Sequence, residues 1–279
     1  MFEKKLLQIA HPRPTDDEGL VLLEGAEEGE MIFSGKAVSL VSGEKYPVKS
    51  GYLDLLGRRS GADNIANLTN FLPGAGRGYE PLWRVRSLDI LTGEEFSNER
   101  EVEIMAGLSG VEKGGVFLDL GCSAGLYTRS LAKVLGGEGS VVGIDISPSM
   151  LREAARRAKR FGASSSSLPS FARADAENLP FADESMDGAL CGGSLNEFGD
   201  PGRVLRETRR VLRSEGRIAI MGILRARTKN GLRLQKLLSM GGVRFFEEDE
   251  IRSMLARSGF DSDVFRTFGS VFFAGAASR

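Results

Sequence analysis

The chain has 279 residues, of which 41% are hydrophobic, so it is long enough for a packed domain with a smaller appendage. Its 37 Lys and Arg nearly balance its 38 Asp and Glu, so no global field concentrates phosphate backbones and we do not expect nucleic acid as a partner. No apolar run has membrane-spanning length, and Cys122 and Cys191 fit neither a disulfide nor a metal site. We therefore expect a cytoplasmic protein without a transmembrane segment, while nothing in the sequence sets an oligomeric state.

The first part of the chain, residues 1–75, carries short apolar stretches broken by glycine and predicts a small β-rich cap. Residues 76–110 follow, with apolar residues at helical spacing such as Val85, Leu88, Met105 and Leu108, and predict a helical lid. Residues 111–279 are expected to form the main domain.

The main domain alternates apolar strand patterns with helical patterns. We expect strands at 116–120, 141–144, 171–173, 188–191 and 217–223, helices at 126–135, 148–161, 203–212 and 247–258, and two final strands at 264–268 and 271–274. Such alternation predicts an α/β, Rossmann-like fold with a mostly parallel sheet and helices on both faces. We assign no helix or strand to the polar stretch rich in Lys and Arg before Glu247.

The turn after the first of these strands is the most informative feature. Asp119 lies at the strand end, and Gly121, Cys122, Ser123 and Gly125 follow in a tight turn of small residues. A carboxylate there opposes a pyrophosphate but attracts the ammonium group of an amino-acid-bearing ligand such as S-adenosylmethionine. Ser123 also stands where a dinucleotide motif has its second glycine, which disfavours a nicotinamide-dependent oxidoreductase. A small-residue turn without any ligand is the alternative.

Two more acids end the neighbouring strands. Asp145, followed by Ile146, is placed to accept hydrogen bonds from ribose hydroxyls, although it is equally suited to cap the helix that follows. Asp175 and Ala176 are placed to contact an adenine ring, with Leu179 and Phe181 as apolar neighbours. An Asx turn with a buried Leu-Pro-Phe is the alternative for this segment.

The loop after the fourth strand begins at Gly192, which we assign to the donor site, and carries the candidate catalytic residues Asn196 and Glu197. Glu197 is the best candidate for a general base, with a solvated carboxylate as the alternative. Ser194 has no histidine to activate it, because the single histidine, His11, lies far away in the sequence.

Taken in order, Asp119-Leu120-Gly121, Gly143-Ile144-Asp145, Ala174-Asp175-Ala176, Leu179-Pro180-Phe181 and Arg210–Gly216 resemble the motifs of class I S-adenosylmethionine-dependent methyltransferases. Over residues 100–279 the chain is most similar to the ubiquinone, menaquinone and plant plastid branch. The resemblance implies S-adenosyl-L-methionine as cofactor and a seven-stranded sheet ordered 3-2-1-4-5-7-6 with the last strand antiparallel. It also implies that a tyrosine before the core, here Tyr79, touches the donor.

The segment Tyr46–Leu56 is similar to a zinc-ribbon cap of some rRNA and plastid methyltransferases, but residues 1–121 contain no cysteine, so we expect no metal site. For the acceptor pocket we expect Tyr79, Trp83 and Phe96 as lid aromatics, and Phe245 and Phe246 on the acceptor side.

The function predicted from the sequence is methyl transfer to a small aromatic or lipophilic acceptor such as a quinol or phenol. An rRNA or tRNA methyltransferase remains an alternative, given the basic cluster between Arg152 and Arg160. A regulatory protein that binds the donor without turnover is a second alternative.

Overall fold

The computed structural model describes residues 1–13, 18–56, 85–111, 114–162 and 168–279. Its described strands form one sheet of twelve, and the seven that come from the main domain lie in the order β8-β7-β6-β9-β10-β12-β11. Their bounds are β6 Val116–Leu120, β7 Ser140–Asp145, β8 Ser170–Arg173, β9 Met186–Gly192, β10 Leu212–Ile223, β11 Phe260–Phe268 and β12 Val271–Ser278. The first five pair in parallel, and β12 runs antiparallel to both β10 and β11. Among these seven strands the predicted order and the antiparallel last strand are found, but the prediction of a seven-stranded sheet is wrong, because the amino-terminal strands join the same sheet.

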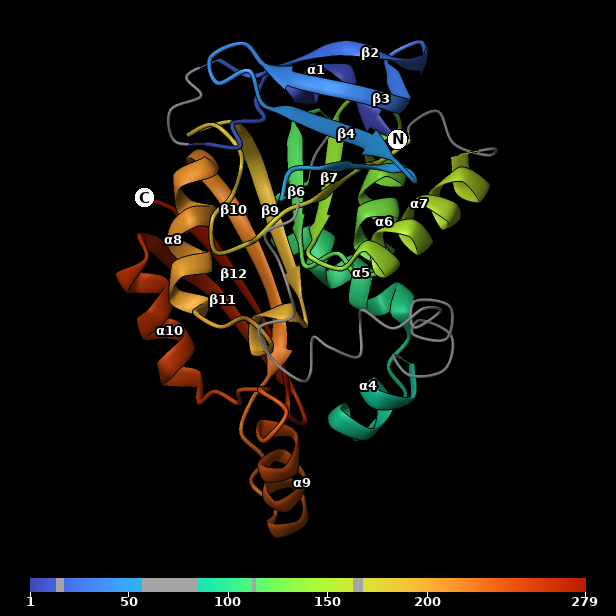
Figure 1. Ribbon diagram of the computed structural model, residues 1–279. Helices are drawn as coiled ribbons and strands as arrows, with labels where there is room; N and C mark the ends of the chain where they lie inside the picture. The colour runs from blue at the N-terminus through green and yellow to red at the C-terminus, as the bar shows by residue number, and fades with distance from the viewer. Residues whose placement is uncertain (14–17, 57–84, 112–113, 163–167) are drawn as a thin grey trace.

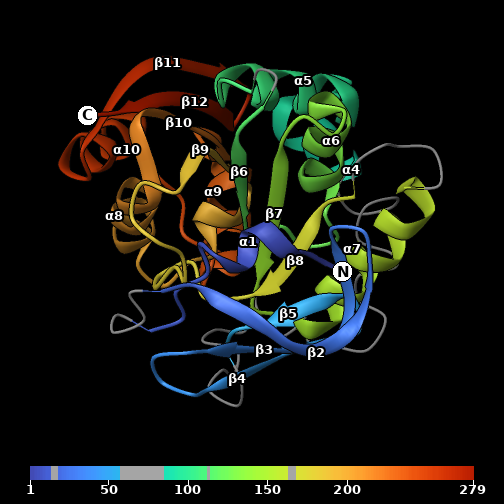
Figure 2. The same ribbon diagram turned by 90° about the horizontal axis from the view of Figure 1, so that it is seen from above.

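Helices cover both faces of this sheet. Figure 2 shows α5 (Asn98–Leu108), α6 (Leu126–Leu135) and α7 (Pro148–Gly162) on one side and α8 (Pro201–Val211) and α10 (Glu248–Arg257) on the other. Strands between two helical layers are buried on both faces, which explains why β6 and β7 are almost continuously apolar.

Local sequence fixes the helix ends. The side chain of Asp200 accepts a hydrogen bond from the Arg203 amide at 3.0 Å, and Pro201 occupies the first turn, so α8 starts two residues before its predicted position. Gly136 ends α6 in a left-handed conformation with φ of 58°, at the predicted position.

The amino-terminal region is β-rich, as predicted. It contains β1 (Phe2–Glu3), α1 (Lys4–Leu7), β2 (Leu20–Glu28), β3 (Met31–Ser39), β4 (Lys45–Lys49) and β5 (Tyr52–Asp54). Because β5 pairs in parallel with β8, these strands extend the central sheet, while β2 and β3 lie at the end of the molecule opposite α9 (Figure 1). The predicted boundary between residues 75 and 76 lies outside the described residues.

Two helices of the predicted lid region are described, α4 (Val85–Thr92) and α5. The expectation that Phe96 is a lid aromatic is wrong. Its side chain is 0% exposed and packs between the rings of Phe268 and Phe273, with centroid distances of 5.2 and 5.8 Å. An aromatic ring next to the apolar face of β12 is stabilised more by this burial than by exposure at a pocket mouth.

A further helix, α9 (Lys229–Ser239), occupies the polar stretch to which we assigned no element. Thr228 caps it by accepting a hydrogen bond from the Gly231 amide at 3.1 Å. Figure 1 shows α9 projecting away from the sheet at the edge where the parallel strands end.

Candidate active site

The turn that follows β6 is held by backbone hydrogen bonds to the neighbouring strand. The Cys122 amide donates to the Ile144 carbonyl at 2.8 Å, and the Ser123 amide donates to Asp145 Oδ2 at 2.9 Å. Gly121, Ser123 and Gly125 all have positive φ, between 49° and 78°, which only glycine adopts without strain. The turn is therefore tied to the end of β7.

A second reason for glycine at position 121 is the proximity of Ser194. A Cβ on this residue would lie 2.4 Å from Ser194 Oγ, and that hydroxyl donates a hydrogen bond to the Gly121 carbonyl at 3.0 Å. The loop after β9 thus rests directly on the turn after β6. This contact brings the two loops that we assigned to donor and catalysis together.

Asp119 is 1% exposed and accepts a hydrogen bond from Thr128 Oγ1 at 2.6 Å. This bond ties the strand end to helix α6 beneath the turn. Burial of the Cys191 thiol, followed by the negative charge of Asp119, raises the pKa of that thiol to about 12. The thiol therefore stays protonated at neutral pH. Direct contact of Asp119 with a ligand ammonium remains a prediction.

Asp145 is half-buried at the carboxyl end of β7. Besides the Ser123 bond, its Oδ1 accepts from the Ser147 amide at 2.8 Å, whereas the cap of α7 is Ser147, whose Oγ accepts from the Met150 amide at 3.3 Å, so the capping alternative for Asp145 is wrong. Burial raises its pKa, and the backbone amides that surround it oppose that rise. The residue after it, Ile146, offers its carbonyl to Arg173 Nε at 3.1 Å. A carboxylate fixed in this way is pre-oriented at the sheet edge.

Asp175 forms the Asx turn that we gave as its alternative, because its Oδ1 accepts from the Glu177 amide at 2.8 Å. Its side chain stays half-buried, while Ala176 beside it is buried. Leu179 and Phe181 belong to the main apolar core, as the alternative of a buried Leu-Pro-Phe predicts, and their contact with an adenine ring remains a prediction. Burial under the sheet extension, where Ala10 pairs with Phe181, accounts for their position.

The loop after β9 contains two residues whose roles are structural in this arrangement. Gly192 gives room to the ring of Tyr127, because a Cβ would lie 1.8 Å from Tyr127 Cε2. Asn196 is 1% exposed and bonds through its amide to Ile223 N at 2.9 Å, Ile223 O at 2.9 Å and Arg244 O at 2.6 Å. With its amide committed to backbone groups, Asn196 acts as a positioning residue.

Glu197 has the most perturbed carboxyl group of this loop. Burial raises its pKa from 4.5 to about 7, and the charge of Asp145 adds to the rise. This charge effect of Asp145 on Glu197 requires the two side chains to share one region of the sheet edge. A carboxylate with a pKa near 7 has the acidity expected of a general base at neutral pH.

Sequence reasoning missed two residues at this edge. Arg173, at the end of β8, forms a buried ion pair with Asp54 of β5 at 3.4 Å and donates to the Ile146 carbonyl. The signal for Asp54 was present, since it is another acid at a strand end. Its strand pairs with β8 across more than a hundred residues of sequence, which no local pattern reveals.

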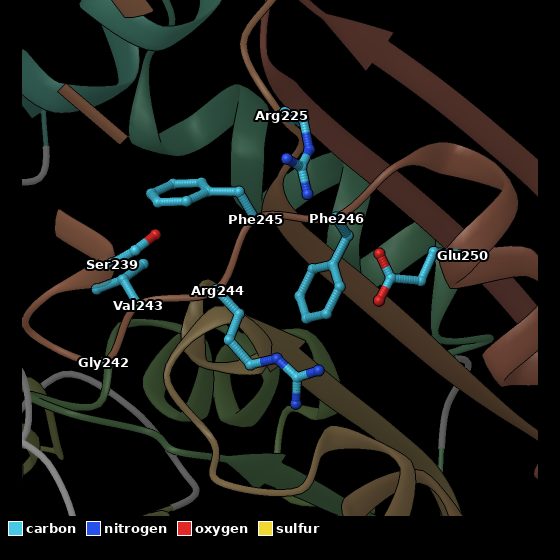
Figure 3. A pocket seen from close by; sticks show the side chains of 8 residues that line it. All are labelled: Arg225, Ser239, Gly242, Val243, Arg244, Phe245, Phe246 and Glu250. Carbon is cyan, nitrogen blue, oxygen red and sulfur yellow. The ribbon is translucent and has the colours of Figure 1, made fainter. Parts of the chain in front are cut away.

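Tyr79 and Trp83 lie outside the described residues, so their predicted roles remain predictions. Phe246 is buried in the core, whereas Phe245 lines a cavity of about 390 Å³ at the base of α9 (Figure 3). The other residues that line it are Arg225, Ser239, Gly242, Val243, Arg244, Phe246 and Glu250.

The single histidine and the basic helix do not join this site. The backbone amide of His11 donates to the Pro180 carbonyl at 2.9 Å, which holds His11 against the sheet extension. On α7, Glu153 forms ion pairs with Arg156 and Arg157, at 2.5 and 2.7 Å. The basic cluster is thus partly neutralised within its own helix.

Comparison with known proteins relates this part of the chain to one family. Residues 118–220 match the family model of a methyltransferase domain, and the strand order above is that of a Rossmann-like fold. Solved structures with this fold include an S-adenosylmethionine-dependent methyltransferase from Aquifex aeolicus, with a TM-score of 0.55 and 20% identity over 70% of this chain and 97% of that one. The [4+2]-cyclase SpnF is also similar, with a TM-score of 0.56 and 19% identity over 73% and 94%.

Curated relatives point to one branch. The chain is 38% identical over 117 residues to a 2-phytyl-1,4-naphtoquinone methyltransferase of Synechococcus elongatus, covering 42% of this chain and 49% of that protein. It is 34% identical over 111 residues to a demethylmenaquinone methyltransferase of Lactobacillus johnsonii, covering 40% and 45%. The chain thus spans about half the length of these relatives. No helix in the described part of the chain is long and apolar enough to cross a membrane.

Proposed function

We propose that the chain transfers a methyl group from S-adenosyl-L-methionine to a lipophilic, quinol-like acceptor. The observation that carries the proposal is the placement of Asp145 and Glu197 at the same carboxyl edge of a domain that matches methyltransferases, where burial and the charge of Asp145 bring the pKa of Glu197 to about 7. The names of the relatives support the acceptor class.

The residues at this edge fit the donor chemically. The half-buried carboxylates of Asp145 and Asp175 offer acceptors for ribose hydroxyls and an exocyclic amine. Leu126, in the first turn of α6, follows Gly125 and begins a helix whose amino end favours a carboxylate. When bound, the donor supplies an electrophilic methyl group on a sulfonium.

In this proposal the chain itself holds the reactants in line and removes a proton. Orientation of a reacting pair is worth ~7–11 kcal/mol, so most of the rate comes from the fixed turn and strand ends. Glu197 takes the proton of the acceptor hydroxyl, which raises electron density at the oxygen or the conjugated ring carbon that is methylated. We further propose a cytoplasmic location, on the basis of two buried free cysteines.

The test combines binding with turnover. Calorimetry should detect binding of S-adenosylhomocysteine and none of NAD, and mass spectrometry should find a methylated product with a naphthoquinol that carries an isoprenoid chain. Binding without turnover on naphthoquinols, benzoquinols and simple phenols would contradict the acceptor class and leave a donor-binding protein. Absence of S-adenosylhomocysteine binding would contradict the donor.

A further inference from the structure

The segment between β10 and α10 projects from the rest of the chain, and we call residues 225–245 the α9 segment. It is closed at its base, where Leu224 pairs with Phe246 and the Arg225 amide donates to the Phe246 carbonyl at 2.8 Å. Gln235 ties the helix to this base by accepting from the Ala226 amide and donating to the Leu224 carbonyl, at 2.8 and 2.9 Å. The segment is thus a fixed projection at the edge that carries the candidate site (Figure 1).

The far part of the α9 segment exposes large apolar side chains. Leu237 is 64% exposed, Leu238 41% and Met240 76%, and Leu232 is exposed as well. Single exposed leucines are common on protein surfaces, but several on one short helix and its end mark an interaction surface. A helix face that contacts only solvent would be expected to carry polar side chains at these positions.

The charge of the α9 segment is of one sign. Residues 223–246 contain six Arg and Lys and no Asp or Glu, in a chain whose net charge is −1. Four of these cations, Arg227, Lys229, Arg233 and Lys236, are exposed and form no ion pair with any residue that the structure describes. An unneutralised cationic patch of this kind is complementary to an anionic surface.

The cavity at the base of the α9 segment is likewise lined by apolar and cationic side chains. Figure 3 shows Arg225 and Arg244 on two sides of the Phe245–Phe246 pair, with Val243 nearby. Arg225 forms an ion pair with Glu247 at 3.0 Å, while Arg244 donates to the Gly199 carbonyl at 3.5 Å. Because the Glu250 carboxylate also lines the cavity and Arg225 is paired, the cations that face an anionic partner are the four exposed ones of the α9 segment.

We propose that the α9 segment docks the protein on the surface of an anionic phospholipid bilayer. A helix of 11 residues is about 16 Å long, too short to span a bilayer but long enough to lie in its interface. Clustered Lys and Arg next to exposed leucines match the pattern of such helices. An RNA partner explains the cations but leaves the leucines without a role, so the bilayer accounts for more of the surface.

Docking in this way turns the carboxyl edge of the sheet toward the bilayer, because α9 projects from that edge (Figure 1). An acceptor dissolved in lipid then reaches the site without crossing water. The inference itself rests on the surface and not on the proposed reaction, since vesicle binding is measured without donor or acceptor.

The experiment is flotation of the full chain with vesicles of phosphatidylcholine and phosphatidylglycerol in a 7:3 ratio, against vesicles of phosphatidylcholine alone. We expect binding to the anionic vesicles that weakens with salt. The double substitution Leu237→Ser with Leu238→Ser, and separately Arg233→Glu with Lys236→Glu, should each weaken it at least ~10-fold.

Two matched pairs serve as controls. Leu40→Ser with Val41→Ser removes another adjacent pair of exposed apolar residues, and Arg203→Glu with Arg206→Glu reverses two cations on α8. Both should leave flotation within ~2-fold, and circular dichroism should show that every variant is folded. Failure of the unmodified chain to bind anionic vesicles, equal binding by the α9 variants, or a dimer in sedimentation that the leucine substitutions dissolve would each overturn the proposal.

Discussion

The turn after β6 and the α9 segment lie at the same edge of the sheet but are built in opposite ways. The turn, residues 121–125, is fixed on both sides by hydrogen bonds to Ile144 and Asp145 and by contact with Ser194. In the described part of the chain, the α9 segment is held at its base, and it carries exposed leucines. The comparison teaches that one edge of this domain combines a rigid part, suited to a small ligand of fixed shape, with a projecting part suited to a larger surface.

The difference in rigidity between the turn and the α9 segment agrees with what each region is proposed to bind. A donor must be held in line to gain from orientation, whereas a surface contact tolerates local opening. Glu197 lies between the two regions, since Asp145 raises its pKa and its neighbour Asn196 binds the base of the α9 segment. Substitutions can therefore separate the two regions experimentally.

The largest expected effect is on the rate, through Glu197. If it is the base, Glu197→Gln should lower kcat by ~100-fold or more with little change in donor affinity. In the unmodified chain kcat should rise with pH around 7, because the carboxyl must lose its proton to act, and the variant should lose this limb. Steady-state kinetics from pH 5.5 to 8.5 measure both, with Glu103→Gln, an exposed residue of α5, as the control.

The same group gives a stability signature that does not depend on activity. Because the pKa of Glu197 is about 7 when folded and 4.5 as the ordinary value, the folded chain holds this proton more tightly. Its contribution to the free energy of unfolding is therefore largest below pH 4.5 and declines as the pH rises to 7. Urea denaturation should show a shallower decline for Glu197→Gln, and an unchanged slope would contradict the raised pKa.

Packing of the rigid region is tested by Gly121→Ala. The new Cβ meets Ser194 and the residue keeps a φ of 64°, so we expect the free energy of unfolding to fall by about 3 kcal/mol. Gly43→Ala is matched, because Gly43 has a φ of 71° and open space around it, and should cost about 1 kcal/mol. Equal losses in chemical denaturation would show that backbone strain alone, without the Ser194 contact, sets the requirement.

Donor affinity is tested by Asp145→Asn. The change removes the charge that accepts hydrogen bonds at the sheet edge, so binding of S-adenosylhomocysteine should weaken ~10–100-fold, equivalent to about 1.5–3 kcal/mol. Calorimetry measures this, with Asp249→Asn on the exposed first turn of α10 as the control. Unchanged affinity would remove Asp145 from the donor site.

The rigid region was the more predictable from the sequence, for a physical reason. Strand ends, glycines with positive φ and helix caps are local features, so Asp119, Gly121, Gly125 and Asp145 were placed on the correct elements. The strand order followed from resemblance to the methyltransferase family, because pairing of β12 with β10 is not written in any local pattern.

The projecting region was missed for the opposite reason. Periodicity identifies a helix by the apolar face that it buries, and α9 leaves Leu237 and Leu238 exposed while burying the polar Gln235. Contacts across long stretches of chain also escaped prediction. The amide of Asn196 binds backbone groups 27 and 48 residues later, so the sequence suggested a catalytic role where the structure has a tether.

The Asn196 side chain gives the smallest expected effect. It also tests most directly whether the turn after β6 and the α9 segment behave as separate regions. Asn196→Ala removes three hydrogen bonds to the backbone of Ile223 and Arg244, and we expect a loss of about 1–2 kcal/mol in the free energy of unfolding. Hydrogen exchange should quicken in residues 225–245 and stay unchanged in residues 121–125, because the turn does not use this side chain. Asn178→Ala, at an exposed position, is the control and should alter neither region. Faster exchange in both regions would mean that the turn and the α9 segment open as one unit, and the division of the edge into a rigid and a projecting part would then be wrong.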